Sequence, residues 1–496
     1  MLKIGWSKRD VSTLEPVNLP GQFHARISQG VMDPIMLNCL VIDDGKDTVI
    51  FMSGDFVSVG YGLIDEIRER LSALRSDIPA EKIIFNATHT HCSPCHYKVD
   101  ILMEALPESM EAYPSIEYRK FLVEAAAQTV IEAYDDRKPG ALAYGYGYAV
   151  VSHSRRVTYR DDVSLRAGYQ SVSHVPQDGH ARMYGNTNDD MFLGYEGGAD
   201  HYVNLLYTFD TEGVLTGAVI NVPCPSQNSE MEYVQTADFW NEVRNTLRAK
   251  YGDIGIVSQC AAAGDLSPRT LHYRAAENRR YALKYGMDTG TGFKREMCNR
   301  ADISARICEA FEEVLEWARK DMITEAEVKH TVKNIQLEQR LITEEEYEYA
   351  KREKERLDAL EFVHTGDEQA DFKNNSKLVT SRSRVTGIVT RYESQRIRKD
   401  CDMELHVVKV GDIAFATNPF ELYIDYQHRI QARSPFTQTF IVQLVGQPAG
   451  YKAGYLATER AVANRGYSAI MYCNQVSWKG GDQLVEETLQ ELKALY

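Results

Sequence analysis

The chain has 496 residues, a hydrophobic content of 44% and a formal net charge of −15. This negative charge argues against nucleic acid or an anionic membrane as the main partner, because both would repel an acidic surface. The length allows about two to four domains of ordinary size, and the hydrophobic content is sufficient for a large buried core.

The predicted elements alternate between strands and helices, which indicates an α/β fold with mixed sheets flanked by helices. In chain order they are a hairpin over 34–51, a helix over 63–74, a strand over 82–85, a helix over 118–134, a hairpin over 203–222, a helix over 237–251, a strand over 254–258, a helix over 303–318, a charged helix over 343–360, a hairpin over 405–416, a helix from Asn418, a strand over 439–445 and a helix over 486–495. Without internal repeats, this order favours one large domain over residues 1–496.

Residues 343–395 are predicted to leave this domain as an exposed excursion. Thr343 and Glu346 have the spacing of a capping box that opens the charged helix. The polar stretch 365–383 follows it and is predicted to contain a mobile loop.

The sequence shows no pattern typical of a targeting signal. Residues 1–10 lack the apolar centre of a signal peptide, and no run of about 18 apolar residues predicts a membrane span. The nine cysteines are odd in number and unpatterned apart from Cys92 and Cys95, which favours a reduced compartment. We therefore expect a cytoplasmic protein that binds a small-molecule substrate, with no nucleic acid and no membrane insertion. A homo-oligomer stays open.

The segment Asn86-Ala-Thr-His-Thr-His-Cys-Ser-Pro-Cys-His96 follows the apolar strand over 82–85. Ligands of open α/β sheets bind beyond the carboxyl ends of strands, and imidazole and thiolate both suit zinc. The candidate metal ligands on this loop are His89, His91, Cys92, Cys95 and His96. A hydrogen-bonded loop pair is the structural alternative for the two leading histidines, and packing is the preferred interpretation of Cys92 and Cys95.

Four segments in chain order resemble the neutral ceramidase family. Asn86–Pro94 is similar to its Thr-His-Thr-His-Ser-Gly-Pro segment, and Gly264-Asp-Leu-Ser-Pro268 is similar to its Gly-Asp-Val-Ser-Pro segment. Asn418-Pro-Phe-Glu421 resembles its Pro-Gly-Glu segment, and Tyr451–Gly466 resembles its Tyr-x-x-Tyr-x-x-Thr segment. The resemblance covers nearly the whole chain. The chain stops where those enzymes continue into an immunoglobulin-like domain, so we expect no such domain here.

The resemblance implies one zinc ion per chain, held by His89, Glu421, Tyr455 and a second histidine. This chain departs from the family at that histidine, because Pro225 of Asn221-Val-Pro-Cys-Pro-Ser-Gln227 occupies its place. Cys224 is the best substitute by ligand softness, with Ser226, Gln227 and Glu230 as alternatives. A weakly bound, different or missing metal also stays open.

The resemblance further implies that His91 lies beside the metal and that Ser267 attacks or activates at the scissile bond. Arg155 resembles the family's active-site arginine, and Tyr467 resembles its tyrosine near the substrate carbonyl. Each motif also has a structural interpretation. Gly264–Pro268 can be an ordinary tight turn, Glu421 can complete a helix cap, and Arg155 with Arg156 can be a solvated pair.

Three functions are compatible with these residues. The first is a zinc amidohydrolase of the ceramidase type, acting on ceramide or on a soluble N-acyl compound. The second is a carbohydrate-active hydrolase on the same scaffold, since Tyr144-Gly-Tyr-Gly-Tyr148 would suit stacking against a polar ring. The third is a binding protein that has lost its metal.

Overall fold

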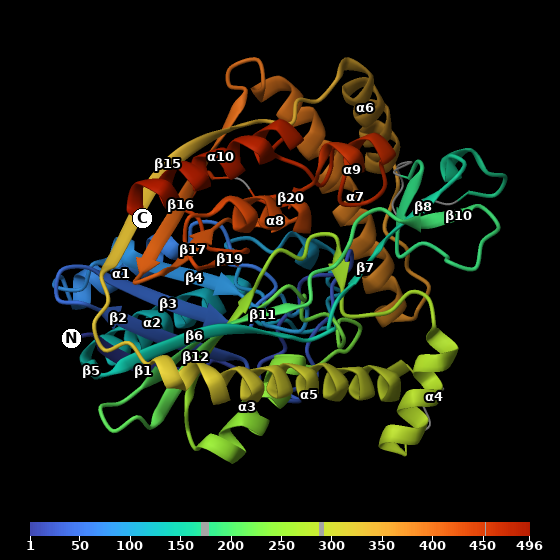
Figure 1. Ribbon diagram of the computed structural model, residues 1–496. Helices are drawn as coiled ribbons and strands as arrows, with labels where there is room; N and C mark the ends of the chain where they lie inside the picture. The colour runs from blue at the N-terminus through green and yellow to red at the C-terminus, as the bar shows by residue number, and fades with distance from the viewer. Residues whose placement is uncertain (170–177, 287–291, 452) are drawn as a thin grey trace.

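Three sheets surround one central core in the computed structural model, which describes residues 1–169, 178–286, 292–451 and 453–496 (Figure 1). The first has the strand order β4 (Ile83–Ala87), β3 (Thr48–Gly54), β2 (Met36–Asp43), β1 (Lys3–Asp10) and β5 (Lys138–Pro139). The second has the order β13 (Gly255–Cys260), β12 (Leu215–Val222), β11 (Tyr202–Phe209) and β6 (Ala141–Tyr148). The third has the order β15 (Val328–Glu338), β16 (Asp400–Val410), β17 (Ile413–Thr417) and β19 (Gln438–Val442).

One hydrophobic cluster joins the three sheets, with Phe51, Val219 and Phe415 among its members. Strand β3 is buried along its whole length, which explains why its sequence is a continuous apolar run rather than an alternating one. Fully burying an aliphatic or aromatic side chain contributes about 1.5–3 kcal/mol, so this shared core holds the three sheets together.

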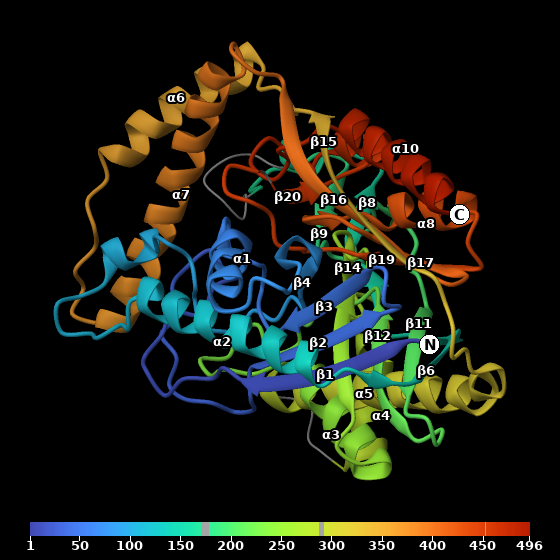
Figure 2. The same ribbon diagram turned by 90° about the vertical axis from the view of Figure 1, so that its left-hand side faces the viewer.

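Helices cover the outer face of each sheet (Figure 2). Helices α1 (Leu63–Leu74) and α2 (Ser115–Asp135) pack on the first sheet. Helices α3 (Phe239–Tyr251) and α5 (Gly292–Ala318) pack on the second, and α8 (Ile424–Arg433) and α10 (Trp478–Leu495) on the third. The predicted α/β class with mixed, helix-flanked sheets is confirmed. None of the helices in the described ranges combines the length and apolar character that a membrane crossing requires.

Parallel strand pairs end at the same place in all three sheets. The pairs are β3 with β4, β12 with β13, and β17 with β19. Beyond their carboxyl ends, Asn86 forms a bridge with Val445, and the Gln443 amide donates to the Cys260 carbonyl at 3.1 Å. The loops that leave these ends therefore meet, as expected for a ligand site in an α/β fold.

The segment 343–395 forms two helices, α6 (Glu344–Asp358) and α7 (Glu368–Ser394), which project beside the sheets (Figure 2). The capping box of Thr343 and Glu346 is confirmed. The predicted loop over 365–383 is wrong, because most of it belongs to α7. Asp367 caps this helix, and Phe372, Val379 and other apolar residues at helical spacing are buried on one side of it.

The helix predicted from Asn418 is also wrong. Residues Phe420–Leu422 instead form β18, which pairs in parallel with β20 (Gly454–Leu456), and α8 begins only at Ile424. Strands β1 and β15 were missed, and α5 and α10 begin earlier than predicted. The smaller elements are β7 (His153–Ser154), β8 (Arg156–Tyr159), β9 (Ala181–Met183), β10 (Phe192–Tyr195), β14 (Leu266–Ser267), α4 (Arg274–Tyr285) and α9 (Glu459–Asn464).

Candidate active site

The convergent loops bring most of the predicted site residues together. His89 and His91 follow β4, Glu421 lies in β18 and Tyr455 in β20, and Arg155 lies between β7 and β8. The parallel pairing of β18 with β20 places Glu421 directly beside Tyr455. Residues that are distant in the sequence thus share one buried site.

His89 faces Glu421 with one ring nitrogen and the backbone with the other. Its Nδ1 lies 2.7 Å from the Val57 carbonyl, which can only accept, so Nδ1 carries the proton. Its Nε2 then points at the Glu421 Oε2, 3.4 Å away. The space between these two atoms therefore suits a positive group. The left-handed backbone of His89, at φ 71°, adds local strain of a kind often found at functional sites.

Arg155 is the buried cation beside this pair, with an exposed fraction of 2%. Its Nη2 lies 3.6 Å from the Glu421 Oε2 and 3.4 Å from the Tyr455 hydroxyl. Burial alone would raise the pKa of Glu421, but the charges of His89 and Arg155 and a hydrogen bond from Tyr455 hold this pKa below its usual value. Glu421 is therefore an anion that can hold a positive group.

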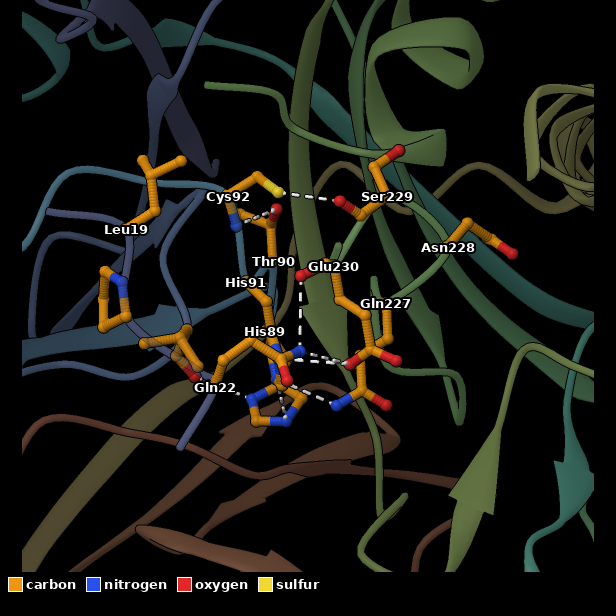
Figure 3. A network of polar contacts seen from close by, with 12 residues as sticks. Leu19, Gln22, His89, Thr90, His91, Cys92, Gln227, Asn228, Ser229 and Glu230 are labelled. Carbon is orange, nitrogen blue, oxygen red and sulfur yellow. Dashed lines mark hydrogen bonds and ion pairs between the residues drawn. The ribbon is translucent and has the colours of Figure 1, made fainter. Parts of the chain in front are cut away.

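His91 lies between Gln227 and Glu230 (Figure 3). Arg155 Nη1 donates to the Gln227 Oε1 at 3.3 Å, so the amide nitrogen of Gln227 faces the other way, 2.8 Å from the His91 Nε2. The His91 Nδ1 lies 3.3 Å from the Glu230 carboxylate, which favours the proton on Nδ1. Burial lowers the pKa of His91, so the ring is neutral at pH 7 and its Nε2 accepts the hydrogen bond from the Gln227 amide.

Arg269 fixes Glu230 on its other side. The two side chains form a close ion pair, and the same guanidinium donates to the Asn228 carbonyl at 3.0 Å. Although burial opposes it, the Arg269 charge holds the pKa of Glu230 far below its usual value. No sequence motif indicated Arg269 or Tyr184. The Tyr184 hydroxyl accepts a hydrogen bond from Arg155 at 3.2 Å. The only sequence signal for Arg269 is its position two residues after Ser267.

Cys224 does not join this group, which corrects the expectation that it replaces the second zinc histidine. Its thiol donates to the Val151 carbonyl at 3.2 Å, and the side chain belongs to the core between the second sheet and its helices. Pro223 and Pro225 bracket Cys224, and the next polar side chain that reaches the site is Gln227. Gln227, one of the alternatives from the sequence, lies instead between His91 and Arg155.

Ser267 and Tyr467 border the site through their contacts with Arg269 and Tyr455. The Ser267 hydroxyl is fully buried and accepts a hydrogen bond from the Arg269 amide at 3.1 Å, in keeping with a tight turn. The Tyr467 ring packs edge-on against Tyr455, with 5.7 Å between centroids. Burial raises the pKa of Tyr467, so its hydroxyl stays protonated and can donate.

The other candidate ligands of the histidine loop have structural partners. The Cys92 thiol donates to the Ser229 carbonyl at 2.9 Å, and the His96 Nε2 accepts from the Gly60 amide at 3.1 Å. Cys92 and Cys95 are both buried, which agrees with the packing interpretation. Burial raises the pKa of the Cys92 thiol to about 12, so it is a poor nucleophile.

A cavity of about 610 Å³ borders His89 and Glu421. Its wall is mainly apolar and aromatic, with Val57, Val59, Tyr61, Tyr97, Leu444 and Val445 among its residues. This volume is in the usual range for small-molecule sites. An apolar group can therefore lie next to the His89–Glu421 pair.

Comparisons with known proteins give a result at the level of the fold. No protein-family model matches the chain, and no curated protein does. All of the chain superimposes on 74% of neutral ceramidase from Pseudomonas aeruginosa, with a TM-score of 0.68 and 15% identity. It has the fold of a neutral ceramidase. A ceramidase complexed with C2 gives a TM-score of 0.64 at 14% identity, over the whole chain and 75% of that protein.

The donors at His89 fit a metal ion with three protein ligands. No group of three or more His, Cys, Asp or Glu side chains in the described ranges forms a metal site. The third donor is instead the tyrosine hydroxyl of Tyr455, hydrogen-bonded to Glu421. Three protein ligands are the number that catalytic zinc sites use. The Val57 carbonyl accepts from the other ring nitrogen of His89 and so orients the ring, as hydrogen-bond partners of zinc-binding histidines do. His89, Glu421 and Tyr455 are thus a chemically suitable set.

Proposed function

We propose that the protein is a zinc-dependent hydrolase that cleaves an amide bond in a small N-acylated substrate. The observation that carries this proposal is the convergence of His89, Glu421 and Tyr455 with Arg155 and His91 beside a ligand-sized cavity. The ceramidase fold supports it by analogy. In this proposal one zinc ion is held per chain, by His89, Glu421 and Tyr455.

The bound ion would supply hydroxide near neutral pH and polarise the scissile carbonyl. His91 would accept and return a proton at Nε2, which lies 3.4 Å from the His89 Nε2, as the Gln227 amide that donates to this atom turns aside. Glu230 stabilises the protonated form of His91, and Gln227 holds the ring in place. General acid–base work of this kind contributes about 10²–10⁴-fold to a rate.

Arg155 and Tyr467 are proposed to stabilise the negative charge that develops on the substrate oxygen. Arg155 is always protonated, and its buried position makes its charge more effective than it would be in water. Ser267 is proposed as a hydrogen-bond donor beside the reacting carbonyl. The apolar cavity would receive the acyl group, which explains why an amide substrate fits better than a fully polar sugar.

A substrate screen tests the proposal. Purified wild-type protein and His89→Ala are incubated with a panel of N-acyl compounds and with chromogenic glycosides, and released amine or chromophore is measured. We expect amine release by the wild type alone. Glycoside cleavage would instead support a carbohydrate-active hydrolase, and inactivity towards both panels despite one bound zinc per chain would contradict the amidase proposal.

A further inference from the structure

Helix α7 contacts the Gly21–Ala25 loop, which packs against His91. Gly21 on this loop has φ +112°, and a Cβ added there would lie 2.5 Å from the His91 ring, so the loop is pressed against the histidine. The Phe23 carbonyl accepts from the Thr380 hydroxyl of α7 at 2.9 Å, and the Ala25 amide donates to the Ser376 hydroxyl at 3.0 Å. Side chains of α7 are thereby placed next to the candidate active site.

Arg384 of α7 reaches the aromatic side of that site. Its guanidinium lies 4.4 Å from the ring centroid of Phe23 and 5.7 Å from that of Tyr467. The two rings form an edge-to-face pair at 5.4 Å, and Tyr467 packs in turn on Tyr455. Arg384 is partly exposed, and no carboxylate of the described residues pairs with it. The guanidinium therefore keeps its hydrogen-bonding capacity.

Two lysines continue this positive charge along the same helix face. Lys373, Lys377 and Arg384 are separated by four and seven residues, so they lie on one side of α7. Burial lowers the pKa of the neighbouring His24 to about 4, with further contributions from the charges of Lys373, Arg26 and Lys377. Neither lysine has an acidic partner among the residues that the structure describes. A positive stripe thus leads to Tyr467 on a chain whose net charge is −15.

We propose that Arg384 binds an anionic group on the amine part of the substrate, so that the site selects N-acyl compounds bearing a carboxylate, phosphate or sulfate. This inference rests on the proposed amide hydrolysis. In this arrangement the acyl group occupies the apolar cavity beside His89, and the amine part extends past Tyr455 and Tyr467 to Arg384. A guanidinium matches such anions through paired hydrogen bonds, and the two lysines draw them towards it.

The alternative is that Arg384 only stacks on Phe23 and Tyr467 as a structural cation–π contact. A matched pair of probes separates the two. N-hexanoylglycine and N-hexanoylglycinamide have nearly the same size and differ in the charge of one end. We expect wild-type kcat/KM to favour the carboxylate by about 10- to 100-fold, the range for a hydrogen bond to a charged group. This preference should weaken as salt is raised.

Arg384→Gln should remove the preference, and Arg384→Lys should retain part of it. Arg396→Gln is the control, because Arg396 also lies over a ring, 5.4 Å from that of Tyr392, but beyond the end of α7. An unchanged preference in Arg384→Gln, or equal loss in Arg396→Gln, would overturn the inference.

Calorimetric binding of both probes separates this inference from the proposed activity. Tighter binding of the carboxylate by the wild type, lost in Arg384→Gln, supports the anion site even when neither probe is hydrolysed, in which case the hydrolase proposal alone fails. Hydrolysis without any preference contradicts the anion site alone. If neither probe binds at millimolar concentration, both proposals are contradicted.

Discussion

The two halves of the candidate site use the same residue types in different ways. One half combines His89, Glu421 and Arg155, and the other combines His91, Glu230 and Arg269. In the second half the carboxylate forms a close ion pair with its arginine, whereas Arg155 stays 3.6 Å from Glu421. Ion-pair hydrogen bonds are usually about 2.7–2.9 Å long. The His89 half is thus loosely paired and borders the cavity, while in the His91 half the carboxylate is held tightly by its arginine. We infer that the first half receives ion and substrate and the second positions a base.

Removing His89 should have the largest effect. His89→Ala deletes the only imidazole among the three proposed ligands, so we expect loss of bound zinc and of measurable amine release. His96→Asn is the control from the same loop, because His96 accepts a backbone hydrogen bond and does not face Glu421. Full zinc occupancy in His89→Ala would exclude His89 as a ligand.

Removing the Ser267 hydroxyl should have the next largest effect. As a donor to the developing oxyanion it would contribute about 10²–10³-fold, so Ser267→Ala should lower kcat by that factor. A loss of several orders of magnitude would indicate a nucleophile instead. A change below about tenfold would mean that the hydroxyl serves only the turn in which it accepts from Arg269.

Acid should destabilise the fold through histidines that are buried in the neutral form. Burial lowers the pKa of His96 from 6.5 to about 4, so the unfolded chain binds a proton before the folded one does. The free energy of unfolding should therefore fall as the pH drops from about 6.5 to about 4, by about 3 kcal/mol from this residue. Urea unfolding across this range measures it. His96→Asn should flatten the slope, and an unchanged slope would contradict the assignment.

Changing Cys224 should have the smallest effect. Because its thiol lies in the core and contacts Val151, Cys224→Ser should alter stability by about 1 kcal/mol and leave zinc content and kcat unchanged. Zinc analysis and thermal unfolding of the purified variant measure both. A lower zinc content would restore Cys224 to the ligand set and remove the distinction between the two halves.

Local patterns in the sequence predicted much of the fold. The hairpin of β2 and β3, the strand before His89 and the capping box at Thr343 depend on neighbouring residues, and all three were predicted correctly. Strand β18 was mistaken for a helix because its partner β20 lies more than thirty residues away. The chain's Pro419 also suggested a helix start, which the pairing overrides.

The candidate site was predictable only in part for the same reason. Motif order identified His89, Glu421 and Tyr455, which the structure brings together. The softness of a thiolate ligand favoured Cys224 as the fourth zinc ligand. The backbone instead directs Gln227 to His91 and turns the Cys224 thiol into the core. The position of Arg384 beside Tyr467 depends on how α7 docks on the Gly21–Ala25 loop, which no local pattern specifies.

Zinc stoichiometry in two carboxamide variants tests the difference between the halves most directly. Glu421→Gln and Glu230→Gln each remove one charge, from two glutamates of similar burial that face His89 and His91. Titration of the metal-free proteins with zinc should give one tight site in the wild type and in Glu230→Gln, and none in Glu421→Gln. Tight binding by Glu421→Gln, or its loss in Glu230→Gln, would contradict the account.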